Sequence, residues 1–167
     1  MEPYPYADPG SLLADGGMVV ALDEVTDPRN LGAVARSAEV AGAAGLVIPE
    51  RRSVGVNATV AKTSAGAVEH LPVARVRNLA DWLEEAKKQG AWVYGADAGG
   101  DSVYTDTDLT GPLVLVLGSE GKGLRPRVAA TCDAIVSIPV RGKVDSLNVS
   151  VAAAVLLFEA ARQRAGR

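Results

Sequence analysis

Short aliphatic runs bounded by glycine and proline are the feature that most constrains this chain. The run LVLVL at residues 113–117 leads into the polar loop GSEGKG, and AIVSIPV at residues 134–140 leads into RGKVDSLN. Runs of this length without polar alternation are typical of strands buried on both faces, as in a parallel sheet. Ligands of α/β proteins bind in loops at the carboxyl ends of such strands. We therefore expect these two loops to form one composite site.

Similar runs recur along the chain and alternate with helical segments. The other predicted strands are Met18–Asp23, Gly45–Pro49, 72–76 and 91–97. Helices are predicted for residues 31–42, 58–66 and 79–90, and from Ser146 to about Arg162. This alternation predicts an α/β domain over residues 18–167, with a mostly parallel sheet flanked by helices. Residues 1–17 are predicted to be an N-terminal arm or linker.

Capping residues and apolar faces refine the predicted helices. Asn30 and Asn78 are good N-caps, and Gly42 and Gly90 can end the helices that follow them. In the first of these helices one face is apolar, and Arg36 points away from that face. The last helix is apolar on most sides, which predicts burial that extends into a subunit interface. The polar segment 98–111 has the composition of a surface loop.

The single cysteine and the single histidine limit the chemistry available to one chain. Cys132 and His70 cannot form a disulfide framework or a Cys/His zinc site, so no metal site is predicted. His70 lies at a predicted helix-to-strand junction, far in sequence from any nucleophile motif, which favours a structural role. No run approaches the roughly 18–20 apolar residues of a membrane span, and the N-terminus lacks a signal-peptide core. A cytoplasmic location is therefore expected.

Charge alone does not identify a nucleic-acid binder. The formal net charge is −3, whereas affinity for phosphate backbones requires clustered Lys and Arg. Local clusters do occur, at Arg51 and Arg52, at Arg75 and Arg77, and at Lys122, Arg125, Arg127, Arg141 and Lys143. They form either an RNA-contacting surface or scattered solvated charge, and composition does not decide between these two interpretations.

No G-x-G-x-x-G motif follows the first strand, and GSEGKGL lacks the spacing of a P-loop.

Three polar segments remain, and each follows a predicted strand. They read DPRNLGAVARSAEVAG, LVLGSEGKGL and SIPVRGKVDSLNVSVAAAVLLFE. In order and spacing they resemble the three motifs of the SpoU (TrmH-like) family, the RNA ribose 2′-O-methyltransferases of the SPOUT superfamily. The resemblance covers about residues 18–162. It implies a deep C-terminal trefoil knot, S-adenosylmethionine as methyl donor with S-adenosylhomocysteine as product, and a homodimer.

Two further segments resemble one branch of this family. KTSAGAVEHLPVARVRNL and PYPYAD are similar to the enzymes that methylate a guanosine of 23S ribosomal RNA. Transfer RNA remains an alternative substrate, and a non-catalytic RNA-binding module of the same fold is a third possibility. Relatives in this branch carry an N-terminal RNA-binding domain, which we expect to be absent from these 167 residues.

The resemblance also assigns roles to individual residues. Gly118, Ile138 and Leu147 match donor-binding positions in three converging knot loops, and Ser146 and Gly95 are added as candidates for the same pocket. For Ser146 a second interpretation is open, because this residue could also cap the last helix. Lys122, Arg125 and Arg141 are candidates for contacts with RNA phosphates.

Four polar residues are implied to act on the ribose acceptor. Arg36 matches the catalytic arginine, as a base or as a group that orients the 2′-hydroxyl; a free guanidinium does not readily lose its proton. Asn30, Glu120 and Asn148 match the other polar positions. Glu120 could orient Arg36 or Asn148, and Asn148 could bind the ribose or Glu120. Asn30 and Arg36 precede the donor loops by many residues, so the fold or a second subunit must bring them there.

Overall fold

A single parallel sheet organises the chain. The structure is a computed structural model that describes residues 3–119 and 121–166. In this part of the chain the strand order is β3-β2-β1-β6-β4-β7-β5, and every pairing is parallel. The strands are β1 (Met18–Asp23), β2 (Gly45–Pro49), β3 (Val73–Val76), β4 (Trp92–Ala96), β5 (Ser102–Val103), β6 (Leu113–Gly118) and β7 (Ala134–Ser137). The predicted α/β class is therefore confirmed, while the trefoil knot stays a prediction.

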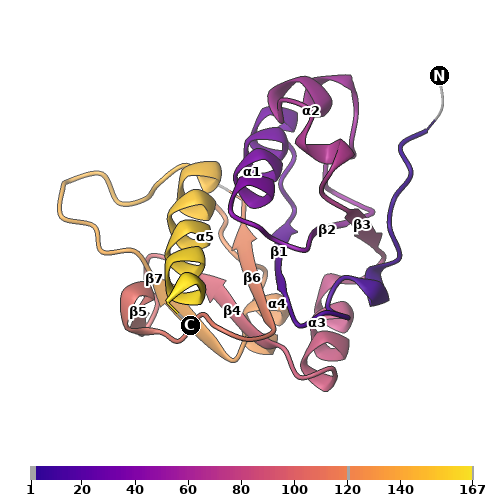
Figure 1. Ribbon diagram of the computed structural model, residues 1–167. Helices are drawn as coiled ribbons and strands as arrows, with labels where there is room; N and C mark the ends of the chain where they lie inside the picture. Colours follow the sequence, from indigo (N-terminus) through magenta and orange to yellow (C-terminus); the bar gives the residue numbers. More distant parts are fainter. Residues whose placement is uncertain (1–2, 120, 167) are drawn as a thin grey trace.

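Helices cover both faces of this sheet (Figure 1). One face carries α1 (Pro28–Val40), α2 (Ala58–Thr63) and α5 (Val149–Ala165), and the other carries α3 (Leu79–Lys88) and α4 (Pro126–Thr131). Three short 3-10 helices complete the described elements: η1 (Pro9–Ser11), η2 (Ala67–Glu69) and η3 (Tyr104–Asp106).

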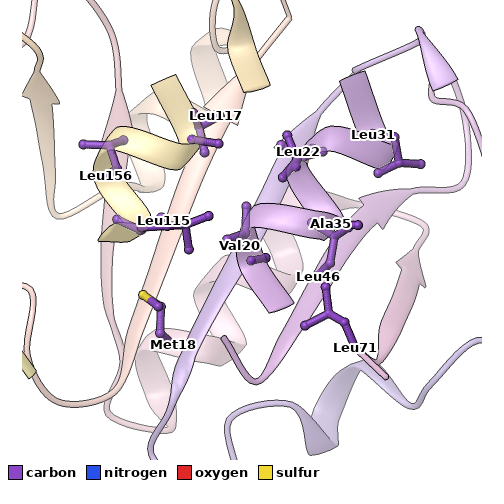
Figure 2. Packing of buried hydrophobic residues seen from close by; sticks show 14 of the residues in the cluster. Met18, Val20, Leu22, Leu31, Ala35, Leu46, Leu71, Leu115, Leu117 and Leu156 are labelled. Atoms are coloured by element: carbon purple, nitrogen blue, oxygen red, sulfur yellow. The ribbon is translucent and has the colours of Figure 1, made fainter. Parts of the chain in front are cut away.

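The central strands explain why the core has two halves. Val20 of β1 lies opposite Leu115 of β6, and both pack beneath α1 and α5 beside Leu156 (Figure 2). Their neighbours Val19 and Val114 point to the other face, into a second apolar cluster that includes residues of α3. Because successive side chains of a strand alternate between faces, burial on both faces requires continuous aliphatic runs.

One predicted helix cap is confirmed and two are wrong. Asn78 caps α3, its side chain accepting a hydrogen bond from the backbone N–H of Asp81 at 3.0 Å. In α1 the cap is Asp27 instead of Asn30, because Pro28 already has the φ of a first helical residue. In α5 the cap is Asn148 instead of Ser146, its Oδ1 accepting from the N–H of Ser150 at 2.8 Å.

Other element bounds also differ from prediction. Segment 98–111 is not only loop, because β5 pairs with β7 there and η3 follows. The run at residues 134–140 is a strand only as far as Ser137, and α2 ends at Thr63 instead of residue 66. The short helix α4 between β6 and β7 was not predicted. These short elements have no sustained periodicity, so their ends are fixed by tertiary packing.

Residues 3–17 pack against the domain. The Tyr4 hydroxyl donates to the carbonyl of Val68 at 2.8 Å, and the Tyr6 hydroxyl accepts from the N–H of Val56 at 2.9 Å. Leu12 and Leu13 are buried against the α3 side of the sheet. The segment therefore covers the β3 edge of the sheet through specific contacts.

Candidate functional site

A pocket of about 330 Å³ lies at the carboxyl edge of the sheet, where β4, β6 and β7 end. Its size is within the range of about 300–1,000 Å³ for small-molecule sites. It brings together the two loops that the sequence analysis assigns to one site. The lining residues are Ala96, Asp97, Ala98, Leu117, Gly118, Ser119, Gly121, Gly123, Val136, Ile138, Val140, Asp145, Ser146, Leu147, Val149 and Ala152.

Gly118 is the residue on which the shape of this pocket most depends. A Cβ atom at this position would lie 2.2 Å from the carbonyl carbon of Gly123, closer than non-bonded atoms approach. Ser119 and Gly123 form an antiparallel bridge, and Gly123 has a φ of +65°, in the left-handed region that favours glycine. The loop after β6 therefore folds back on its own strand and presents backbone groups to the pocket.

Four of the five predicted donor-binding residues line this pocket. They are Gly118, Ile138, Ser146 and Leu147. Gly95 does not: it is buried within β4, where a Cβ would meet Leu124 at 2.6 Å, so its place in the fold is one of close packing. The β4 contribution comes instead from the residues that follow Gly95.

Two acidic residues of the pocket were missed by sequence reasoning. Asp97 follows β4, and Asp145 precedes the segment that leads into α5. Asp97 is the last residue of the predicted strand 91–97, and this position at a strand end is a signal that could have identified it, since strand ends carry the site.

Asn30 and Asn148 meet beside the pocket. The Asn148 Nδ2 group donates to Asn30 Oδ1 at 3.2 Å, joining residues 118 positions apart. Asn30 lies in the first turn of α1, and Asn148 caps α5. The contact therefore couples the starts of two neighbouring helices. Glu120, the third residue predicted to act here, lies outside the described residues.

Arg36 lies apart from this asparagine pair. It is exposed on α1, six residues and about 9 Å of helix axis beyond Asn30. It forms no ion pair with a carboxylate in residues 3–119 or 121–166. Asp27, the cap of α1, binds Arg29, and hydrogen bonds from Arg29 lower the pKa of the Asp27 carboxyl.

Arg125 is engaged inside the protein. Asp23, at the end of β1, has a fully buried side chain; its carboxylate accepts from the backbone N–H of Arg125 at 2.9 Å and from Arg125 Nε at 2.8 Å. Glu24 lies 3.5 Å from the same Nε. The hydrogen bond to Asp23 raises the pKa of Arg125. By contrast, Lys122 and Arg141 are exposed close to the pocket-lining segments.

Other reactive groups do not converge on the pocket. Burial raises the pKa of the Cys132 thiol to about 11, so this thiol is protonated near neutral pH and a poor nucleophile. His70 is exposed after η2. Within the described residues, no group of three or more His, Cys, Asp or Glu could hold a metal ion.

None of the helices in the described part of the chain is long and apolar enough to cross a membrane.

Comparison with known proteins identifies the family. The sequence profile of the SpoU rRNA Methylase family matches residues 17–158. The chain belongs to this family. The predicted SpoU resemblance is thus confirmed over most of the domain. The three motifs that carried it contain the asparagine pair and most of the pocket lining.

SpoU relatives match the chain in both sequence and fold. YacO of Bacillus subtilis, named for the TrmH family of tRNA/rRNA methyltransferases, is 53% identical over 143 residues, which are 86% of this chain and 57% of YacO. An uncharacterized tRNA/rRNA methyltransferase of Mycobacterium ulcerans is 50% identical over 169 residues, which are 98% of this chain and 54% of the relative. The chain spans about half the length of these curated relatives.

Two solved methyltransferase structures share the arrangement of nearly the whole chain. AviRb from Streptomyces viridochromogenes, in complex with AdoMet, superposes with a TM-score of 0.88 at 34% identity, covering 98% of this chain and 67% of AviRb. An AdoMet-bound rRNA methyltransferase from Sinorhizobium meliloti gives a TM-score of 0.87 at 32% identity, covering 95% of this chain and 61% of that one.

The buried pair predicts unequal effects of two nearby arginine substitutions. Arg125→Ala leaves the buried Asp23 carboxylate without its guanidinium partner, while the backbone N–H of residue 125 remains as a donor. It should lower the free energy of unfolding by about 2–3 kcal/mol, below the ~3–5 of a fully buried pair because Arg125 is 43% exposed. Arg127→Ala removes only an exposed pair with Asp81 and should cost less than about 1 kcal/mol. Urea unfolding measures both, and equal losses would contradict the assigned role of Asp23.

Proposed function

We propose that this chain transfers a methyl group from S-adenosylmethionine to a ribose 2′-hydroxyl of RNA. The observation that carries the proposal is the location of the asparagine pair beside a pocket lined mainly by the second and third SpoU motifs. Solved family members with AdoMet bound support the choice of donor. Membership of a family named for rRNA methylation supports the acceptor.

The pocket has the properties that this donor requires. Ile138, Leu147 and Val136 provide an apolar wall that suits an adenine ring, and the glycine loop provides backbone N–H and C=O groups. The Asp97 and Asp145 carboxylates can accept hydrogen bonds from ribose hydroxyls or from the amino group of the donor. When bound, the donor supplies an electrophilic methyl group on a sulfonium sulfur.

The protein's own residues then have the task of orienting the acceptor. The Asn148 amide donates through Nδ2 to Asn30 and accepts through Oδ1 from the N–H of Ser150. Because both groups are used, the orientation of the Asn148 amide is fixed, and with it that of Asn30. The amide group of Asn30 can bind a ribose oxygen. Alignment of this kind supplies a large share of the rate in transfer reactions. As the 2′-oxygen takes the methyl group, its proton leaves to solvent.

For Arg36 we favour a positioning and charge-neutralising role. A guanidinium presents a planar fork that matches phosphate oxygens. The separation of Arg36 from Asn30 along α1 agrees with contact to the RNA backbone next to the reacting ribose. A base would have to lose a proton that a guanidinium does not readily give up.

A guanosine of 23S ribosomal RNA is the substrate we propose. The segments KTSAGAVEHLPVARVRNL and PYPYAD, which resemble the ribosomal branch of the family, support this choice. The Sinorhizobium meliloti neighbour is also named an rRNA methyltransferase. Transfer RNA is the second candidate, because the relatives' names include both RNAs. An enzyme with either substrate would act in the cytoplasm.

We also propose a homodimer in which α5 contributes to the interface. The helix buries one side against the sheet, yet its outward side is apolar as well, with Val151 48% and Phe158 47% exposed. These two positions are seven residues apart and therefore lie on one face. A second copy that covers this face would remove the exposed apolar surface from water.

Calorimetry with S-adenosylhomocysteine tests the donor site. The wild-type protein should bind this product, and Gly118→Ala should abolish binding, because the added Cβ forces the loop after β6 away from its strand. Gly142→Ala is the matched control, since a Cβ there meets no atom within 4 Å. A folded wild-type protein that does not bind S-adenosylhomocysteine would overturn the enzyme proposal.

An Arg36→Ala variant tests the acceptor side. It should bind S-adenosylhomocysteine like wild type while methylation of unmodified ribosomal RNA falls by at least about 100-fold, the scale of losing an electrostatic contact in a transition state. Normal methylation by the Arg36→Ala variant would remove the role given to Arg36.

Mapping the methylated nucleotide in ribosomal and transfer RNA transcripts decides between the two substrates.

The dimer proposal predicts the effect of a charge on α5. Phe158→Asp should convert a particle of twice the 17.2 kDa chain mass into a monomer in analytical ultracentrifugation. Val40→Asp is a matched control, because Val40 is 65% exposed on α1 and lies outside the proposed interface. A wild-type monomer at micromolar concentration would rule the dimer out.

A further inference from the structure

Four arginines that form two clusters in the sequence meet at the carboxyl ends of β2 and β3. Arg51 and Arg52 follow β2, while Arg75 lies in β3 and Arg77 follows it. The two strands are paired in parallel, and the ladder continues past their ends, because the backbone N–H of Glu50 donates to the carbonyl of Val76 at 2.8 Å. The loops that carry the arginines are therefore held side by side.

Two of the four arginines are engaged by neighbouring groups. Arg52, in the left-handed region at a φ of +57°, lies 4.0 Å from the carboxylate of Glu24. The guanidinium of Arg75 stacks over the ring of Tyr6, 4.8 Å from its centroid. These contacts occupy one arginine of each cluster with groups of the protein itself.

The other two arginines share a hollow. Arg51 and Arg77 line a cavity of about 250 Å³ together with Glu50. Neither arginine forms an ion pair with a carboxylate among residues 3–119 and 121–166. Two guanidinium groups and one carboxylate give this hollow a net charge of +1.

The loop after β2 is anchored on both sides of Arg51. Glu50 is tied to Val76 as above, and the Ser53 hydroxyl donates to the carbonyl of Val25 at 3.1 Å. The N–H of Val54 donates to the same carbonyl at 3.1 Å. Arg51 is thus presented from a fixed backbone, which lowers the entropy lost when its guanidinium binds an anion.

We propose that Arg51 and Arg77 form a subsite for one phosphodiester of the RNA substrate, away from the methylated ribose. The inference rests on the proposed RNA methyltransferase function. Arginine suits this ligand, because its planar fork matches two phosphate oxygens. Phosphate contacts of this kind fix the register of a nucleic acid without reading its sequence.

The location of the hollow fits a strand that also reaches the donor pocket. The hollow and the pocket lie on the same edge of the sheet, and β1 separates β2 from β6. With strands about 4.8 Å apart, the β2–β3 boundary is roughly 12 Å from β6. A stacked RNA strand advances about 3.4 Å per nucleotide, so the bound phosphate would be about three or four nucleotides from the pocket.

The acidic groups that follow β1, between the hollow and the pocket, do not oppose such a path. Glu24 and Asp27 are each paired with an arginine: Glu24 with Arg52 at 4.0 Å and Asp27 with Arg29 at 3.2 Å. Because their charge is compensated, the field between hollow and pocket is not strongly repulsive to a phosphate backbone.

Fluorescence polarisation with a labelled single-stranded RNA oligonucleotide tests the subsite in the full chain. The double variant Arg51→Ala/Arg77→Ala should bind about tenfold more weakly. Its slope of log affinity against log salt should decrease by about 0.7, the value for one phosphate of a single strand, and not by about 1.4. Glu50→Gln should instead strengthen binding, because it removes the one negative charge of the hollow. Affinity for S-adenosylhomocysteine should not change in either variant.

Matched variants separate a built site from general positive charge. Arg75→Gln removes one positive charge from the same edge, where the double variant removes two. Because Arg75 does not line the hollow, the RNA affinity of this variant should stay within about twofold of wild type. Arg51→Lys/Arg77→Lys should keep the salt slope and recover part of the affinity, because lysine retains charge without the fork.

Several results would overturn the subsite. They are an equal loss of affinity in Arg75→Gln, unchanged binding in the double alanine variant, or no RNA binding by wild type. Sodium phosphate that displaces RNA better than sodium chloride of equal ionic strength, in wild type only, would assign the hollow to free phosphate. Failure to bind S-adenosylhomocysteine, with these RNA effects intact, would remove the methyltransferase proposal and leave the phosphate subsite.

Discussion

A buried carboxylate sets the arrangement of the carboxyl edge. Asp23 ends β1 with its side chain fully buried, and a charge in that environment is stable only when it is paired and hydrogen-bonded. Arg125 meets this requirement with its backbone N–H and its guanidinium. Since Arg125 directly precedes α4, the contact ties the far end of the glycine loop to the strand next to β6. The loop that borders the donor pocket is thereby held at both ends, by β6 and by β1.

Helix capping supplies the second constraint, and here structure and proposed chemistry use the same atoms. Asn148 must accept a hydrogen bond from the N–H of Ser150 to begin α5, which leaves its Nδ2 group directed at Asn30. Asn30 is free to face Asn148 because Asp27 performs the capping of α1. The shift of the cap from Asn30 to Asp27 is therefore what makes Asn30 available for the site.

Sequence patterns predicted the parts of the fold that repeat a period or use a strong cap. The aliphatic runs identified β1, β2 and β6, and Asn78 fixed the start of α3. The two-residue strand β5 and the short helix α4 were beyond such patterns, because tertiary packing alone stabilises them. For the site, the strand-end rule and the family motifs indicated Gly118, Ile138, Ser146 and Leu147. They missed Asp97 and Asp145, and they did not separate Gly95, a packing position, from its neighbours in the pocket.

Arginine partners show why net charge is a poor guide to what this edge can bind. Arg125, a predicted RNA contact, is occupied by Asp23, whereas Arg51 and Arg77, left undecided by composition, have no described carboxylate partner. The chain carries more acids than bases, yet Asp23, Glu24 and Asp27 are compensated by Arg125, Arg52 and Arg29, respectively. Between the hollow and the pocket, an RNA strand would therefore meet little uncompensated negative charge. An acidic protein can thus have a phosphate-binding edge, provided that the carboxylates along the path are paired internally while a few arginines are not.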